Sequence, residues 1–314
     1  MPLTPDVQQI INGFAALGPQ PEPGTVSPQQ MRLMAAQTWN KSGPFQPVAD
    51  VYERMIPGPG GELRVRVYVP EGSGPFPLLV WFHGGGWVIG TLYENEGACR
   101  ALCRLAEAVV MSVEYRLAPE HPFPAAAEDA FAAVCWAAEH GEELRADPGR
   151  IAVAGESAGG NLAAVCALKA RDTGAVRLAL QILLAPVLGA PQDGRPSYTD
   201  FADGYFLSRA SMEFFFDQYP RSTADLREAY LLPLAAEDLR GLTPALVMTA
   251  ECDVLRDEGE EYAHRLTEAG VPCELVRYDG QIHGFFGLLD DQLAVSAEAH
   301  ATAAAALRHA FGDP

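Results

Sequence analysis

The most constraining feature of the sequence is Ser157, which lies among small residues between a predicted strand and a predicted helix. Residues 155–160 have the sequence Gly-Glu-Ser-Ala-Gly-Gly, between the apolar residues 151–154 and the helix-forming residues 161–168. Such a strand–turn–helix junction strains the backbone of Ser157 and needs almost no side chain two residues before and after it, where Gly155 and Gly159 stand. The junction therefore predicts an exposed serine hydroxyl, with the positive end of a helix directly behind it.

Strand and helix patterns alternate through most of the chain, which is typical of an α/β fold with a mostly parallel central sheet and helices on both faces. Residues 51–69 are expected to form an antiparallel hairpin at the sheet edge. The further strands are expected at 78–82, 109–115, 178–184, 245–249 and 274–278, and the main helices at 94–107, 125–140 and 292–311. We assign residues 46–188 and 241–314 to the two parts of this core.

Two regions do not follow the alternation. Residues 1–45 contain two amphipathic helical patterns, at 5–17 and from Ser27 to about Trp39, separated by a proline-rich break. Residues 189–240 concentrate aromatic side chains. Each region is either a packing extension or half of a lid over a substrate pocket, and for any single aromatic residue both interpretations stay open.

Composition excludes several classes of function. The 314 residues carry a net charge of −19 and only two lysines, Lys41 and Lys169, so the chain is expected to repel nucleic acids and anionic membranes. Neither a secretory signal pattern nor an apolar run of about 18 residues is visible. The six cysteines have mostly apolar neighbours and form no metal-binding pattern. We therefore expect a cytoplasmic protein without stable membrane insertion, disulfides or metal.

A serine nucleophile needs a base and an orienting acid. His283 lies in a glycine-flanked loop after the last predicted strand, and Asp253 follows the strand at 245–249. Both loops end at the carboxyl edge of the sheet, where ligands of such folds bind. Asp257 is the second candidate for the acid, but we expect it to cap or pair locally. The order Ser157, Asp253, His283 is the one that the α/β-hydrolase fold imposes.

The other histidines along the helices have simpler explanations. His264, His300 and His309 are expected on solvated helix faces. His140 ends a helix, where the negative end of the helix dipole favours it.

A second glycine motif follows the buried strand at 78–82. Residues 83–87 have the sequence His-Gly-Gly-Gly-Trp. Three glycines let a backbone approach a substrate and turn its N–H groups inward, so this loop is expected to supply oxyanion donors.

Together these segments resemble the hormone-sensitive-lipase family of α/β-hydrolases, in its bacterial carboxylesterase branch. Residues 115–125 resemble a family signature between the two glycine motifs, residues 253–259 its acid motif and residues 283–285 its histidine motif. The resemblance implies that Gly85, Gly86 and Ala158 donate to the oxyanion and that His83 supports the glycine loop. It also implies a cap built from residues 1–45 and an insertion at 189–240.

The sequence departs from the branch at two positions. Glu156 stands where aspartate is usual, and Val254 stands where proline usually follows the acid. The motif with Glu156 is also typical of the larger cholinesterase-like carboxylesterases, but chain length and the Asp253 motif argue against that group. We expect the departures to change contacts behind the elbow and to leave the triad intact.

The sequence therefore predicts a serine carboxylesterase that hydrolyses short-chain esters through an acyl-enzyme and needs no cofactor. Amide hydrolysis or acyl transfer with the same triad is one alternative. A non-catalytic ligand-binding receptor on the same fold is another, although such receptors lack the catalytic histidine that His283 supplies. The strand near residues 272–278 is expected to be an exposed edge that could pair in a homodimer.

Overall fold

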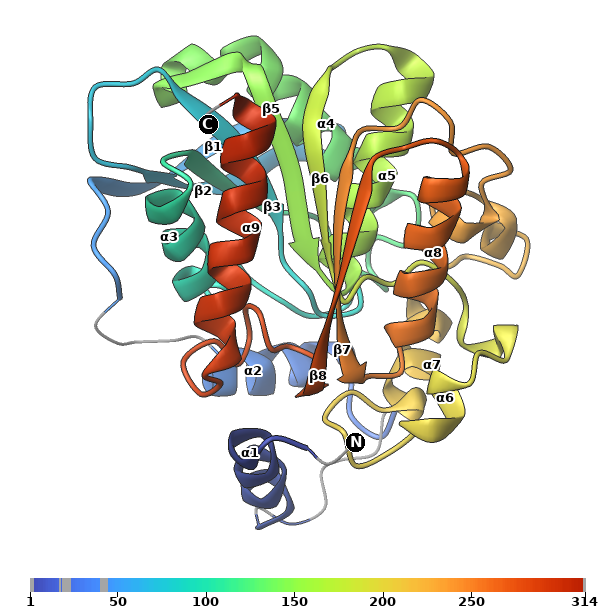
Figure 1. Ribbon diagram of the computed structural model, residues 1–314. Helices are drawn as coiled ribbons and strands as arrows, with labels where there is room; N and C mark the ends of the chain where they lie inside the picture. The colour runs from blue at the N-terminus through green and yellow to red at the C-terminus, as the bar shows by residue number, and fades with distance from the viewer. Residues whose placement is uncertain (1–2, 17, 19–23, 40–44, 313–314) are drawn as a thin grey trace.

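The computed structural model describes residues 3–16, 18, 24–39 and 45–312 (Figure 1). Eight strands form one sheet in the order β1-β2-β4-β3-β5-β6-β7-β8. Their bounds are β1 Asp50–Gly58, β2 Gly61–Val69, β3 Phe76–Phe82, β4 Val109–Glu114, β5 Ala146–Glu156, β6 Leu178–Leu184, β7 Ala245–Cys252 and β8 Cys273–Ile282. The predicted hairpin at the sheet edge is confirmed, since β1, β2 and β4 pair antiparallel and the remaining strands pair parallel.

Helices cover both faces of the sheet, as an α/β fold requires. Helices α3 and α9 cover one face, and α4, α5 and α8 cover the other (Figure 1). The α-helices described are α1 Pro5–Ala16, α2 Pro28–Trp39, α3 Glu96–Leu105, α4 Ala125–His140, α5 Ala158–Thr173, α6 Ser197–Asp200, α7 Arg209–Gln218, α8 Arg256–Glu268 and α9 Val295–Phe311. Short 3₁₀ turns are η1 Gly141–Leu144, η2 Pro191–Asp193, η3 Asp225–Arg227 and η4 Pro233–Ala235.

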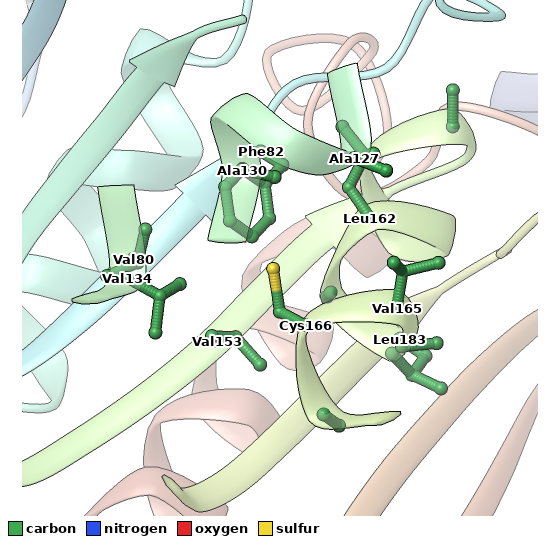
Figure 2. Packing of buried hydrophobic residues seen from close by; sticks show 14 of the residues in the cluster. Val80, Phe82, Ala127, Ala130, Val134, Val153, Leu162, Val165, Cys166 and Leu183 are labelled. Carbon is green, nitrogen blue, oxygen red and sulfur yellow. The ribbon is translucent and has the colours of Figure 1, made fainter. Parts of the chain in front are cut away.

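The core lies on both sides of the central strands. Along β3, Val80 and Phe82 pack with residues of α4 and α5 such as Leu162 (Figure 2). Leu79 and Trp81, which point to the opposite face, belong to the cluster under α3 and α9. Because consecutive strand residues alternate between faces, a strand buried on both sides needs the continuous apolar run that predicted β3.

The segments outside the alternation gather at one end of the sheet. Helices α1, α2, α6 and α7 lie beyond the carboxyl ends of the parallel strands (Figure 1). The rings of Phe14 on α1, Trp39 on α2 and Phe206 pack together with centroids 5.4–5.9 Å apart. Most of the proline-rich break before α2 falls outside the described residues. The division into cap and core by residue number stays a prediction.

Arg32 fixes helix α2 to the rest of the chain. Its guanidinium donates to the carbonyl oxygens of Val88 and Ala118, at 2.7 Å each. It also forms a two-pronged pair with Glu120, at 2.9 and 2.6 Å. These bonds hold α2 against the turn that follows the glycine loop.

Candidate active site

Ser157 occupies the turn between β5 and α5. Its backbone has φ 61° and ψ −120°, a region that side-chain-bearing residues rarely adopt. A Cβ atom at Gly155 or Gly159 would overlap main-chain atoms of the neighbouring segments, so only glycine fits at either position. Such local strain is typical of functional positions, because the surrounding structure must hold it in place.

His283 and Asp253 form a hydrogen-bonded pair at the ends of the last two strands. His283 Nδ1 lies 2.7 Å from Asp253 Oδ2, and the other carboxylate oxygen accepts the N–H of Leu255 at 3.0 Å. Both side chains are buried. Since an ionised carboxylate only accepts, Nδ1 carries the proton and Nε2 is left as the basic nitrogen.

The carboxylate also sets how readily the imidazole takes a proton. Burial lowers the pKa of His283, but the charge and hydrogen bond of Asp253 outweigh it, so the pKa is raised above 6.5. This buried pair can therefore hold a proton taken from a neighbouring hydroxyl.

Ser157 and His283 line one cavity of about 70 Å³. Among the described residues the structure shows no hydrogen bond between these two side chains. Catalytic hydrogen bonds often form only once substrate is bound. The cavity is lined by Ala35, Trp39, Gly84, Gly85, Ile89, Glu94, Asn95, Glu156, Ser157, His283, Gly284 and Leu288.

The glycine loop leaves main-chain donors unused beside this cavity. Gly85 and Gly86 have φ values of 105° and 58°. The Gly85 carbonyl accepts the N–H groups of Val88 and Ile89, which closes the turn. In the described part of the chain the N–H groups of Gly85 and Gly86 donate no hydrogen bond. Gly85 lines the cavity, whereas Gly86 packs against the ring of Phe215.

Ala158, the third predicted donor, stands at the start of helix α5. It is the first residue of α5, and the first main-chain bond of that helix runs from Asn161 N–H to the Ser157 carbonyl, at 3.0 Å. The N–H groups of the opening turn have no partner within a helix. The Ala158 N–H therefore lies directly after Ser157 with no bond inside its own helix.

His83 has the supporting position that the resemblance implies. Its ring stacks on Tyr115 with centroids 4.2 Å apart, and its carbonyl oxygen accepts the Tyr115 hydroxyl at 2.8 Å. Burial lowers the pKa of His83 to about 4. The ring is thus neutral at physiological pH, and it holds the loop both by packing and through its Nδ1, which lies 2.7 Å from the Gly84 carbonyl oxygen.

Glu156 joins the serine turn to the histidine loop. Its Oε1 accepts the N–H groups of Phe286 and Gly287, at 3.3 Å each, and the side chain is buried. The side chain of Glu156 is longer than that of the usual aspartate, and it reaches the segment that follows His283. Val254, the other departure, is fully buried.

The remaining acid and base candidates lie elsewhere. Asp257 accepts the N–H of Ser197 and pairs with Arg256, as local pairing predicts. The expectation that His300 is solvated is wrong: it is 7% exposed, and its Nε2 contacts the Phe286 carbonyl at 2.7 Å. His300 lies on the face of α9 that packs against the core, so its ring braces the loop after His283.

Sequence reasoning missed Glu94 as a site residue. The sequence pattern predicts Glu94 inside a helix, but it lies in the turn before α3, whose first residue is Glu96. Glu96 pairs with Arg66 and Arg100 and is structural. Glu94 and Glu96 are only two residues apart, and nothing in the sequence shows that one lines the cavity while the other forms structural ion pairs.

Neither a metal centre nor a membrane span is found in what the structure describes. No group of three or more His, Cys, Asp or Glu side chains in the described ranges could hold a metal ion. None of the described helices is both long and apolar enough to cross a bilayer.

Comparison with known proteins adds independent information. Residues 79–287 match a family described as having the alpha/beta hydrolase fold. The carboxylic ester hydrolase LipN of Mycobacterium tuberculosis is 49% identical over 246 residues, which are 76% of this chain and 65% of LipN. The carboxylesterase NlhH of the same organism is 42% identical over 80% of this chain and 79% of its own. The hyperthermophilic esterase of Pyrobaculum calidifontis superposes with a TM-score of 0.91 at 41% identity, over 98% of this chain and 99% of that one.

Proposed function

Because the chain belongs to the alpha/beta hydrolase fold family, in the branch that resembles hormone-sensitive lipase, we propose that it is a serine carboxylesterase. The observation that carries the proposal is the hydrogen-bonded pair of His283 and Asp253, of which His283 lines the same cavity as Ser157 in its strained turn. The relatives named carboxylesterase and esterase support the same class of reaction.

In the first half-reaction the Ser157 hydroxyl attacks the ester carbonyl carbon while His283 Nε2 takes its proton. Asp253 holds the tautomer and stabilises the imidazolium. The N–H groups of Gly85, Gly86 and Ala158 donate to the oxyanion. Collapse of the tetrahedral intermediate breaks the ester C–O bond, and the leaving alkoxide receives the proton from His283.

In the second half-reaction water replaces the alcohol. His283 takes a proton from the water as it attacks the acyl-enzyme, and the same donors hold the new oxyanion. Collapse returns the proton to Ser157 and releases the carboxylic acid. Every proton is returned, so the cycle needs no cofactor.

The size of the cavity supports short acyl groups. Its volume is about 70 Å³. Trp39, Ile89 and Leu288 are part of its wall, so a longer chain requires these side chains to move.

Replacement of the nucleophile tests the proposal. Hydrolysis of para-nitrophenyl butyrate by Ser157→Ala is expected to fall by about 10³-fold or more, while the exposed Ser73→Ala control keeps wild-type activity. A para-nitrophenyl organophosphate should label wild-type Ser157 with one equivalent. Near-wild-type turnover by Ser157→Ala, or no labelling, would overturn the mechanism, and the second result would favour a receptor.

Several finer expectations stay predictions. Product analysis separates ester hydrolysis from acyl transfer to an alcohol, and an amide analogue tests amidase activity. The cytoplasmic location and a homodimer formed through β8 likewise await measurement.

A further inference from the structure

Glu94 is a buried carboxyl group in the wall of the candidate active site, and the mechanism above does not use it. It lines the same cavity as Ser157 and His283, yet it is only 6% exposed. It comes from the turn between β3 and α3, a segment separate from those that supply the triad. Its position makes it a neighbour of any ester bound there.

The carboxyl group has an unmet bonding capacity. The Thr91 N–H donates to it, but Oε1 has no hydrogen-bond partner among the described residues. Leaving a buried polar atom unbonded costs about 1–3 kcal/mol. Folded proteins rarely accept that cost without a bound water, ion or ligand to satisfy the atom.

The other titratable groups in the cavity wall are already engaged. Glu156 accepts two main-chain N–H groups, and His283 is bonded to Asp253. Burial raises the pKa of Glu94 to about 7, although the Thr91 N–H opposes the shift. In either protonation state an oxygen of Glu94 can accept a hydrogen bond from a neutral donor.

We propose that Glu94 determines specificity by accepting a hydrogen bond from a hydroxyl group on the substrate, beside the scissile ester. The preferred substrates are then short hydroxyl-bearing carboxylic esters. This inference rests on the proposed function. A hydroxyl suits the site better than a methyl group of equal size, because the methyl would leave Oε1 buried and unbonded.

Three pairs of esters that differ by hydroxyl against methyl test the proposal. They are the para-nitrophenyl esters of β-hydroxybutyrate and isovalerate, those of lactate and isobutyrate, and hydroxyethyl acetate against propyl acetate. Each kcat/KM is divided by the rate of alkaline hydrolysis of the same ester, which removes differences in intrinsic reactivity. The pairs place the hydroxyl on the acyl side at two positions and on the alcohol side.

The wild type is expected to prefer the hydroxyl ester by about tenfold or more in at least one pair. Glu94→Leu should reduce that ratio to near one, whatever change it makes in the absolute rate for the methyl partner. Glu94→Gln, which keeps a carbonyl acceptor, should retain most of the preference, and the exposed Glu62→Gln control should retain all of it.

Ratios near one in all pairs for the wild type, or an unchanged preference in Glu94→Leu, would overturn the inference and leave the esterase standing. Turnover of none of the six esters, or turnover that persists in Ser157→Ala, would overturn the proposed function itself. A Glu94→Leu variant that does not fold would leave the wild-type ratios and Glu94→Gln to decide.

Discussion

One hydrogen bond ties the acid to the base in the candidate site. Asp253 contacts Nδ1 of His283 at 2.7 Å and contributes the charge that raises the pKa of the imidazole against the effect of burial. Only the neutral imidazole can accept the Ser157 proton. The acid side of the pH profile therefore reports this pair directly.

For the wild type we predict that kcat/KM falls as the pH decreases through a midpoint above 6.5. In Asp253→Asn the charge of Asp253 disappears while burial and the smaller raising effect of Glu156 remain, so the midpoint should move to lower pH. The kcat should also fall by about 10⁴-fold, because the wrong tautomer is favoured. Profiles of kcat/KM against pH for a para-nitrophenyl ester measure both effects.

Asp257→Asn is the matched control, since Asp257 lies four residues from Asp253 and pairs with Arg256 and Ser197. It should leave the midpoint in place. A large shift in this variant with none in Asp253→Asn would mean that the acid is assigned wrongly.

The candidate triad residues could be singled out from the sequence because each stands in a short motif. The strained turn at Ser157 needs glycines two residues away, and these are visible in the sequence. Glu94 and His300 have no such signature. Their roles follow from which side of a turn or helix is packed inward, and that depends on contacts with segments far along the chain.

At the scale of elements, one arginine makes most of the polar contacts that attach α2. Arg32 bonds to the carbonyl oxygens of Val88 and Ala118 and to Glu120. This guanidinium lowers the pKa of Glu120 to about 2, so the carboxylate stays charged at ordinary pH. Ala35 and Trp39 of the same helix line the cavity.

We predict that Arg32→Ala loosens α2 and weakens the discrimination between short and long acyl chains. The ratio of kcat/KM for acetate over octanoate esters should fall roughly fivefold, the effect of about 1 kcal/mol. Arg209→Ala is the control, because Arg209 pairs with Glu213 on its own helix. An unchanged chain-length profile in Arg32→Ala would contradict a role of α2 in closing the cavity.

Element types were predictable from periodicity, whereas some boundaries were not. Helix α4 and strand β6 begin and end where the sequence predicts. Strand β5 begins at Ala146, before Pro148 and Gly149, which argue locally against a strand. Its first residue pairs with Phe76 ahead of an irregularity in the register, so a long-range contact extends the strand past unfavourable residues.

At the scale of the whole molecule, the two-sided core determines how the six cysteines are exposed. Four of them, Cys99, Cys103, Cys166 and Cys252, are buried, and all six are free thiols. Cys135 and Cys273 are partly exposed, but burial still raises the pKa of both thiols, that of Cys273 to about 11. Thiolate is the reactive form, so even these two should react slowly.

We predict that Ellman's reagent labels at most two cysteines in the native protein and all six after denaturation in guanidinium. Cys135→Ser and Cys273→Ser together should abolish the native signal, with little change in the denaturation midpoint. Fast labelling of four or more thiols in the native state would show that the faces of the sheet are less tightly covered than the structure indicates.

Glu156 has a consequence for how such an enzyme can diversify. It extends from the strand that presents Ser157 and holds the loop just after His283, and His300 of α9 braces the same loop from another side. Helix α2, which supplies Ala35 and Trp39 to the cavity wall, contributes neither brace, and α1 packs on it through Phe14. Selectivity can therefore be rewritten by exchanging α1 and α2 for those of a relative, and the chimera should keep its turnover chemistry while adopting the donor's choice of ester.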